Sequence, residues 1–133
     1  MTNQSDEPVR RFAEAITRCD IDAALLLCDP EVEFLSVLAV DGKAYVGYEG
    51  IRRYFDDIES AWEQWRVDIH GTAVAPDGRV IIEMTMHALG KGSGAALAEF
   101  AAHVWTLRDG KLLRNEPFRD REQAERAVGL SHL

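Results

Sequence analysis

Basic residues and long apolar runs are scarce in this chain of 133 residues, and each scarcity excludes a class of protein. Fifteen lysines and arginines stand against 23 acidic residues, which gives a net charge of −8. No basic face is therefore expected that could neutralise nucleic-acid phosphates or anionic lipid headgroups. No apolar run approaches the roughly 18 residues that span a bilayer. We expect neither nucleic acid nor membrane as a partner.

Cysteine is scarce as well, since Cys19 and Cys28 are the only two thiols. Their spacing fits neither a CxxC motif nor a metal site, and the four histidines are scattered. The polar, acidic first residues are unlike a secretory signal. These features predict a reduced, cytoplasmic protein in which both cysteines are small core residues, with no metal and no cofactor.

Apolar residues make up 47% of the chain, enough for a hydrophobic core in one domain over residues 1–133. They recur with helical spacing at Val9, Phe12, Ala13 and Ile16, and again from Ile51 to Trp62. A short helix is expected after Asp20, which is a good N-cap, and another over residues 120–130. The sequence thus predicts three helices in the first half and a short one at the C-terminus.

Strand patterns occupy most of the remainder, at residues 32–37, 65–74, 80–89, 97–107 and 112–118. Turn residues at 41–43, 76–78 and 108–111 separate them. Because the later strands are joined as hairpins, the predicted fold is α+β with a mostly antiparallel sheet.

Alternation along two strands predicts which side chains face the helices. Even-numbered residues from Val80 to Ala88 are apolar and should face inward, so that Glu83 and His87 face outward. Residues 99–107 are apolar on both faces, which predicts cover on both sides. One face carries Glu99, Ala101, His103 and Trp105, and the other carries Phe100, Ala102, Val104 and Thr106. We expect one of these faces to line a pocket and the other to meet a partner subunit.

Several of these segments resemble the SnoaL-like group of the nuclear transport factor 2-like superfamily. The matching residues are 9–12, 20–22, 25–26, 32–34, 45–51, 92–94, 102–111 and the terminal helix. The resemblance implies a cone-shaped, strongly curved sheet wrapped on three helices, with a deep apolar cavity. It also implies a homodimer through the convex face of the sheet.

The resemblance places Phe12, Phe34, Phe55 and His103 on the cavity wall. The ketosteroid isomerase branch would need a carboxylate base at Phe34, phenols at Phe12 and Phe55, and a neutral carboxylic acid at His103. Phenylalanine can neither give nor take a proton, so this isomerase chemistry is disfavoured. Epoxide hydrolysis is disfavoured too, because no Asp-Arg-Asp set occurs at cavity positions.

Polyketide cyclases of the group resemble the chain more closely, and they use a cavity carboxylate on the last strand. The corresponding residues here are 114–117, and their orientation depends on the preceding hairpin. A three-residue loop with Gly110 in the left-handed region would place Asn115 opposite His103, whereas a two-residue loop would place Glu116 there. We favour Asn115 inward, since Arg114 and Glu116 look like a solvent face.

The candidate catalytic residues are therefore His103, Asn115 and Glu99. His103 would act as a base or hydrogen-bond donor, Asn115 would orient it or hold a ligand carbonyl, and Glu99, about 13 Å along the strand, would lie at the cavity mouth. The expected apolar lining is Phe12, Phe34, Phe55, Trp62, Met84, Met86 and Trp105. Which of the tyrosines reach the cavity stays open at this point.

The expected function is binding of a small hydrophobic organic molecule in an apolar conical cavity. Whether the ligand is also turned over, by a cofactor-independent cyclase, isomerase or hydratase type of reaction, is left open by the sequence. The alternative is a non-catalytic ligand-binding or dimerisation module, which phenylalanine at the expected polar positions favours.

Overall fold

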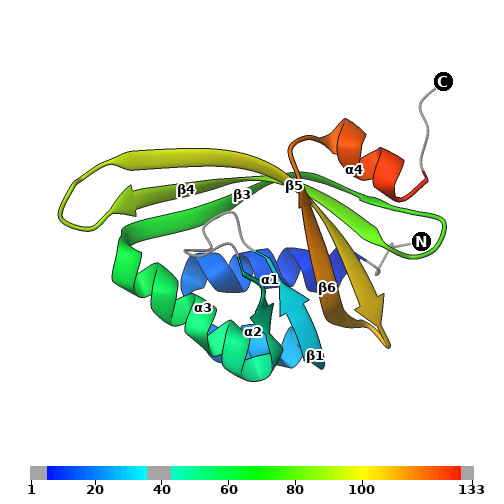
Figure 1. The fold of residues 1–133 in the computed structure, drawn as a ribbon, viewed down its shortest axis with the longest axis horizontal. Helices are drawn as coiled ribbons and strands as arrows, with labels where there is room; N and C mark the ends of the chain where they lie inside the picture. Colours follow the sequence, from blue (N-terminus) through cyan, green and yellow to red (C-terminus); the bar gives the residue numbers. More distant parts are fainter. Residues whose placement is uncertain (1–5, 36–42, 130–133) are drawn as a thin grey trace.

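In the part of the chain that the structure describes, six strands form a single sheet in the order β2-β1-β6-β5-β4-β3, and four helices accompany it (Figure 1). The computed structural model describes residues 6–35 and 43–129. The helices are α1 (Glu7–Arg18), α2 (Ile21–Leu27), α3 (Gly47–Ala61) and α4 (Arg121–Ala127). The strands are β1 (Cys28–Phe34), β2 (Tyr45–Val46), β3 (Trp62–Val74), β4 (Val80–Gly90), β5 (Ala96–Arg108) and β6 (Lys111–Phe118). All neighbouring strands are antiparallel except β1 and β6, which confirms the predicted α+β fold.

The first helices form where the apolar spacing predicts them. Val9, Phe12, Ala13 and Ile16 are all buried along one side of α1. The Asp20 carboxylate accepts a hydrogen bond from the backbone N–H of Ala23, and this cap starts α2. The helix ends at Leu27, and the chain continues directly into β1. The predicted strand over residues 32–37 therefore starts earlier, at Cys28, and its last two residues lie outside the described ranges, as does most of the turn predicted at 41–43.

The long strands β3, β4 and β5 curve over α1 and α3, while α4 lies on the other side of the sheet (Figure 1). Hydrogen bonds fix α1 against β3, and two of them involve the last turn of the helix. The indole N–H of Trp65 donates to the carbonyl of Ile16 at 2.7 Å, and the N–H of Val67 donates to the Thr17 hydroxyl at 2.9 Å. The strongly curved sheet that the sequence predicts is confirmed, and its concave face is the one that holds the main core.

The convex face differs from the expectation in one respect. Ala102 and Val104 are fully buried, but they pack with Ile81 against Ala124 and Val128 of the C-terminal helix. The prediction that a partner subunit covers Ala102 and Val104 is thus wrong, because α4 of the same chain covers them. Phe100, nearer the start of β5, remains 41% exposed.

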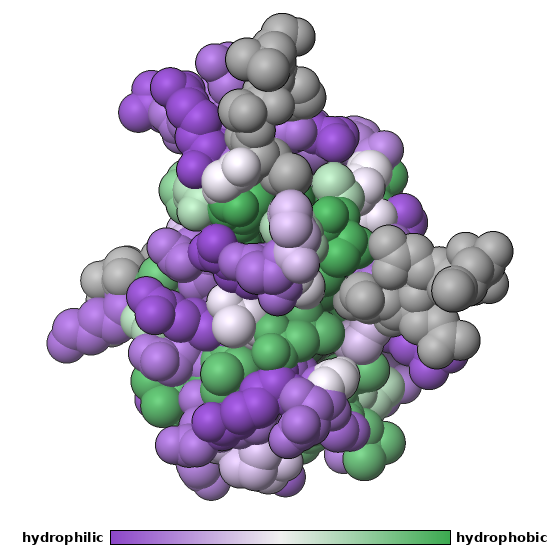
Figure 2. Space-filling model, turned by 90° about the vertical axis from the view of Figure 1, so that its right-hand side faces the viewer, coloured by the Kyte–Doolittle hydropathy of each residue, from purple (hydrophilic) through white to green (hydrophobic). Residues whose placement is uncertain are grey.

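The exterior carries both hydrophobic and hydrophilic side chains (Figure 2). On the end of the molecule seen in Figure 2, hydrophobic patches are interrupted by hydrophilic side chains. Within residues 6–35 and 43–129, no helix combines the length and the apolar character that crossing a bilayer requires.

Candidate functional site

The turn between β5 and β6 decides which residues of β6 face the helices. Arg108 pairs with Lys111, so the loop is the two-residue type, and both Asp109 and Gly110 have positive φ, as such a turn requires. Leu113 is then an extra residue in β6, because Leu107 pairs with Leu112 while Thr106 pairs with Arg114.

This β-bulge reverses the consequence of the two-residue loop. Asn115 pairs with Trp105 and Glu116 with Val104, so Asn115 faces inward and is buried. The predicted inward orientation of Asn115 is confirmed. The predicted three-residue loop is wrong, and so is the position directly opposite His103, which Pro117 occupies.

A narrow cavity of about 20 Å³ lies between α1 and the concave faces of β4 and β5. Among the predicted wall residues, Phe12, Phe34, Met84, Met86 and Trp105 line it, together with Glu99 and His103. Phe55 and Trp62 do not line it. Phe55 is buried on α3 with its ring against Tyr54, and Trp62 starts β3 and packs at the edge of the core.

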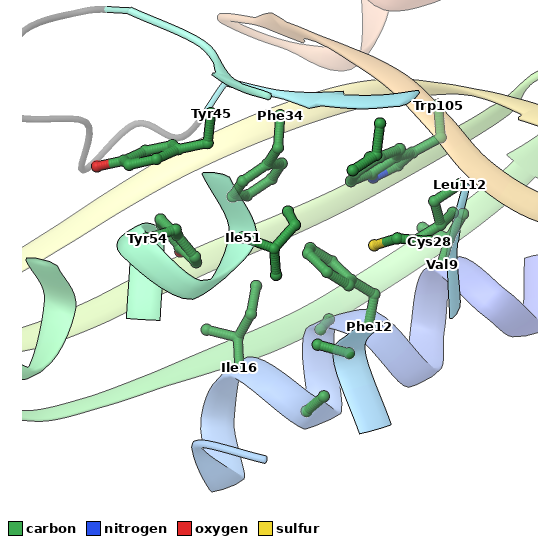
Figure 3. Packing of buried hydrophobic residues seen from close by; sticks show 14 of the residues in the cluster. Val9, Phe12, Ile16, Cys28, Phe34, Tyr45, Ile51, Tyr54, Trp105 and Leu112 are labelled. Carbon is green, nitrogen blue, oxygen red and sulfur yellow. The ribbon is translucent and has the colours of Figure 1, made fainter. Parts of the chain in front are cut away.

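Aromatic rings line one end of the cavity, and Figure 3 shows these residues, Phe12, Phe34, Tyr54 and Trp105, among the packed core side chains. Phe12 of α1 meets Phe34 and Trp105 edge to face, with ring centroids 5.3 and 5.4 Å apart. Phe34 is stacked on Trp105 at 5.7 Å and meets Tyr54 edge-on at 4.8 Å. Interlocked rings of this kind are rigid, so this end of the cavity has a fixed shape.

The other end of the cavity has a softer wall. Moving outward from His103, the paired residues of β4 and β5 are Ile82 with His103, Met84 with Ala101, and Met86 with Glu99. The flexible thioether side chains thus lie between the histidine and the exposed Glu99. Methionine adapts to irregular shapes more readily than aromatic residues do, so this end can change its width.

His103 lies between the two ends and is 2% exposed. Its Nδ1 is 3.0 Å from Nδ2 of Asn115. Its Nε2 is buried without a hydrogen-bond partner in the described part of the chain, and no other buried side-chain nitrogen or oxygen atom there shares this property. Burial lowers the pKa of His103 from 6.5 to about 4, so the imidazole is neutral near pH 7.

Asn115 connects His103 to the end of β1. Its Oδ1 accepts from the N–H of Leu35 at 2.7 Å, and its Nδ2 donates to the Leu35 carbonyl at 2.8 Å. The structure therefore brings His103 and Asn115 together, as the sequence predicted. Glu99 shares the cavity lining but stays at the outer end.

Leu35 and Tyr54 are among the contributors to this site that were not predicted. Leu35 acts through its backbone, which no side-chain pattern could indicate. Tyr54 was on the predicted apolar face of α3, but the sequence did not settle its direction. The Tyr45 hydroxyl donates to the Asp57 carboxylate at 2.7 Å instead, so this phenol group is directed toward α3.

The remaining nucleophilic and metal-binding side chains do not add a second centre. Burial raises the pKa of Cys28 to about 12, and burial together with the Glu59 carboxylate raises the pKa of Cys19 to about 11. Neither thiol is activated as a nucleophile. Within the described ranges, no three His, Cys, Asp or Glu side chains are grouped as metal ligands.

Solved structures share this architecture along most of their length. TerC, co-crystallised with polyporic acid, is 22% identical with a TM-score of 0.75, over 95% of this chain and 98% of that chain. A hypothetical protein from Catenulispora acidiphila with a ketosteroid isomerase-like fold, in complex with trimethylamine, is 21% identical with a TM-score of 0.74, over 94% of each chain. A putative SnoaL-like polyketide cyclase from Shewanella putrefaciens is 13% identical with a TM-score of 0.74, over 89% of this chain and 90% of that chain.

At these identities the structural similarity shows the fold alone. No curated protein matches the chain. The profile of the SnoaL-like domain matches residues 9–115, from α1 to the asparagine beside His103. The match covers most of the chain, which therefore belongs to the SnoaL-like domain family.

Proposed function

We propose that this protein binds a small, largely apolar organic molecule between α1 and the concave face of the sheet. An oxygen atom of the ligand accepts a hydrogen bond from Nε2–H of His103. The apolar part of the ligand lies against the aromatic rings at one end and against Met84 and Met86 at the other.

The observation that carries this proposal is the unpartnered Nε2 of His103 in a lining that is otherwise mostly apolar. A buried donor without a partner destabilises the folded protein by about 1–3 kcal/mol. A ligand that supplies an acceptor removes this cost when it binds. Affinity and orientation would then come from the same contact.

The same hydrogen bond suggests how the site could assist a reaction. A neutral imidazole that donates from Nε2 stabilises negative charge that develops on a ligand oxygen, as in an enolate. His103 cannot at the same time act as a base through that nitrogen. The proposed chemistry is therefore stabilisation of an oxyanion in an apolar surrounding, without a cofactor.

The width of the cavity requires the methionine end to move. A volume of about 20 Å³ accommodates little more than one water molecule. Met84 and Met86 are unbranched and can change rotamer at small cost. Ligand entry would displace these side chains while the aromatic end keeps its shape.

A matched pair of flat probes tests the proposal. Fluorenone carries a carbonyl oxygen, whereas fluorene has the same ring system without it, and quenching of tryptophan fluorescence reports binding of either. We expect fluorenone to bind about tenfold more tightly than fluorene, which corresponds to about 1.4 kcal/mol. His103→Leu should remove this difference.

The control is His87→Leu, the same substitution at a histidine that faces the convex side and contacts Asp68. This variant should retain the tenfold preference. Equal affinities of the unsubstituted protein for the two probes, or no binding of either, would contradict the proposal.

A second candidate function is a module that associates with itself and binds no ligand. The small cavity favours it, and the exposed ring of Phe100 on the convex face could contribute to a homodimer contact. Sedimentation of the protein and of Phe100→Ser tests it. A dimer that dissociates in the variant, together with no binding of fluorenone, would support this second function over the first.

A further inference from the structure

The oxygen and both N–H groups of the Asn115 side-chain amide have hydrogen-bond partners within the protein. Its oxygen accepts from the Leu35 N–H, and its two N–H groups point to the Leu35 carbonyl and to Nδ1 of His103. None of these groups is left to hold a ligand carbonyl. Of the two roles considered for Asn115, orienting the histidine is the one that this geometry supports.

The backbone of Leu35 fixes the orientation of the amide. If the oxygen and nitrogen of the amide were exchanged, the oxygen would face the Leu35 carbonyl and the nitrogen would face the Leu35 N–H. Both contacts would then pair like with like, so the exchanged orientation loses two hydrogen bonds. Nδ2 must therefore face His103.

A donor at this position determines the form of the imidazole. Because Nδ2 presents a hydrogen to Nδ1 of His103, Nδ1 must be the acceptor, and a neutral ring then carries its proton on Nε2. We infer that Asn115, held by the backbone of Leu35, is a positioning residue that keeps His103 in the Nε2–H form, and that the cavity thereby selects ligands with an acceptor oxygen.

The ligand selection in this inference rests on the proposed function, whereas the form of the imidazole does not. With Nε2 restricted to donation, the favoured ligands carry a carbonyl, an ether or an anionic oxygen at their buried end. An ammonium group has only donors and is rejected, because two donors would face each other in an apolar site.

Nitrogen NMR of the ligand-free, 15N-histidine-labelled protein tests the form of the imidazole directly. We expect Nδ1 of His103 to have the pyridine-type signal and Nε2 the pyrrole-type signal. Both should be unchanged between about pH 5.5 and 8, where an unperturbed histidine titrates. His103→Leu identifies the signals, since it removes this histidine from the spectrum.

Asn115→Asp replaces the donor that faces Nδ1 of His103 with an acceptor, with almost no change in size. An ionised carboxylate at 115 has only acceptors, and a protonated one that donates to the Leu35 carbonyl still presents a lone pair to His103. In both cases Nδ1 must carry a hydrogen, so its signal should change to the pyrrole type. Gln64→Glu makes the same amide-to-carboxylate change at an exposed position of β3 and should leave the His103 signals unchanged.

Asn115→Ala is a second variant that does not depend on how a carboxylate is accommodated. It removes the donor, so we expect both neutral forms of His103 to coexist. A pyrrole-type Nδ1 in the unsubstituted protein would overturn the inference, as would unchanged His103 signals in both Asn115 variants. If the signals behave as expected but fluorenone fails to bind, the proposed function fails and the positioning role of Asn115 stands.

Discussion

The two faces of β4 and β5 are built from alternate residues of the same strands, yet they differ in whether their polar side chains have interaction partners. On the convex face, Arg121 of α4 contacts Glu83 at 2.7 Å and Glu125 at 3.4 Å, beside the packed side chains of Ala102 and Val104. On the concave face, His103 has a buried nitrogen without a partner.

The difference shows where packing serves stability and where it leaves room for a ligand. Buried polar groups are almost always hydrogen-bonded, so an exception calls for an explanation. The convex contacts form a finished core under a helix. The concave site deviates from that rule at one atom, and such deviations are expected where a protein binds something.

The largest expected effect contrasts two aromatic residues of β5. Trp105→Ala removes a ring from the rigid end of the cavity and should lower the free energy of unfolding by about 3–5 kcal/mol. Phe100→Ala, on the exposed part of the convex face, should cost less than about 1 kcal/mol, because its ring is only partly covered. Urea denaturation of both variants measures this. Equal losses would mean that Phe100 is as well packed as Trp105.

The next effect is the pH dependence of the free energy of unfolding that is due to His103 on the concave face. In the unfolded chain His103 takes up a proton near pH 6.5, whereas in the folded protein burial lowers its pKa to about 4. As the pH falls from 6.5 to 4, the unfolded state gains the proton first, so the free energy of unfolding decreases. A shift of this size corresponds to about 3 kcal/mol.

The comparison that checks it is the unsubstituted protein against His103→Leu, by urea denaturation at several pH values. The carboxylates are common to both proteins, so their contributions cancel in the difference. The variant should lose less stability over this pH range. Parallel curves would show that His103 takes up its proton in the folded protein as easily as in the unfolded chain.

The smallest expected effect tests the convex face. Arg121→Ala removes the guanidinium that contacts Glu83 and the 6% exposed Glu125, and we expect a loss of about 1 kcal/mol. Arg126→Ala is the control on the same helix, because its pair with Glu122 is exposed on both sides and should contribute close to nothing. Thermal unfolding of the two variants compares them, and a larger loss for Arg126→Ala would reverse the assignment.

Much of the fold could be predicted because burial follows simple periods. The spacing of Val9, Phe12, Ala13 and Ile16 identified the buried side of α1, and the alternation from Val80 to Ala88 identified the inward face of β4. These predictions depend only on which side of one element is apolar.

The errors concern features that depend on two elements at once. The cover of Ala102 and Val104 by α4 requires knowing where the last helix folds back. Phe55 was assigned to the cavity by resemblance, but α3 buries it in the core outside the cavity lining. Asn115 was correctly placed inward by the polar alternation around it, but the loop expected with it was wrong, because a β-bulge has no strong sequence signal when the extra residue is an ordinary leucine.

The extra residue Leu113 sets the register of β6, and so decides which of its side chains face inward. In the present pairing the amide of Asn115 faces inward beside His103, and the carboxylate of Glu116 faces outward. Without the bulge, the pairing of β6 with β5 would shift by one residue, and the carboxylate of Glu116 would lie opposite His103. A related chain without the bulge would therefore place a carboxylic acid beside the histidine in place of an amide, although no residue of the site had been exchanged.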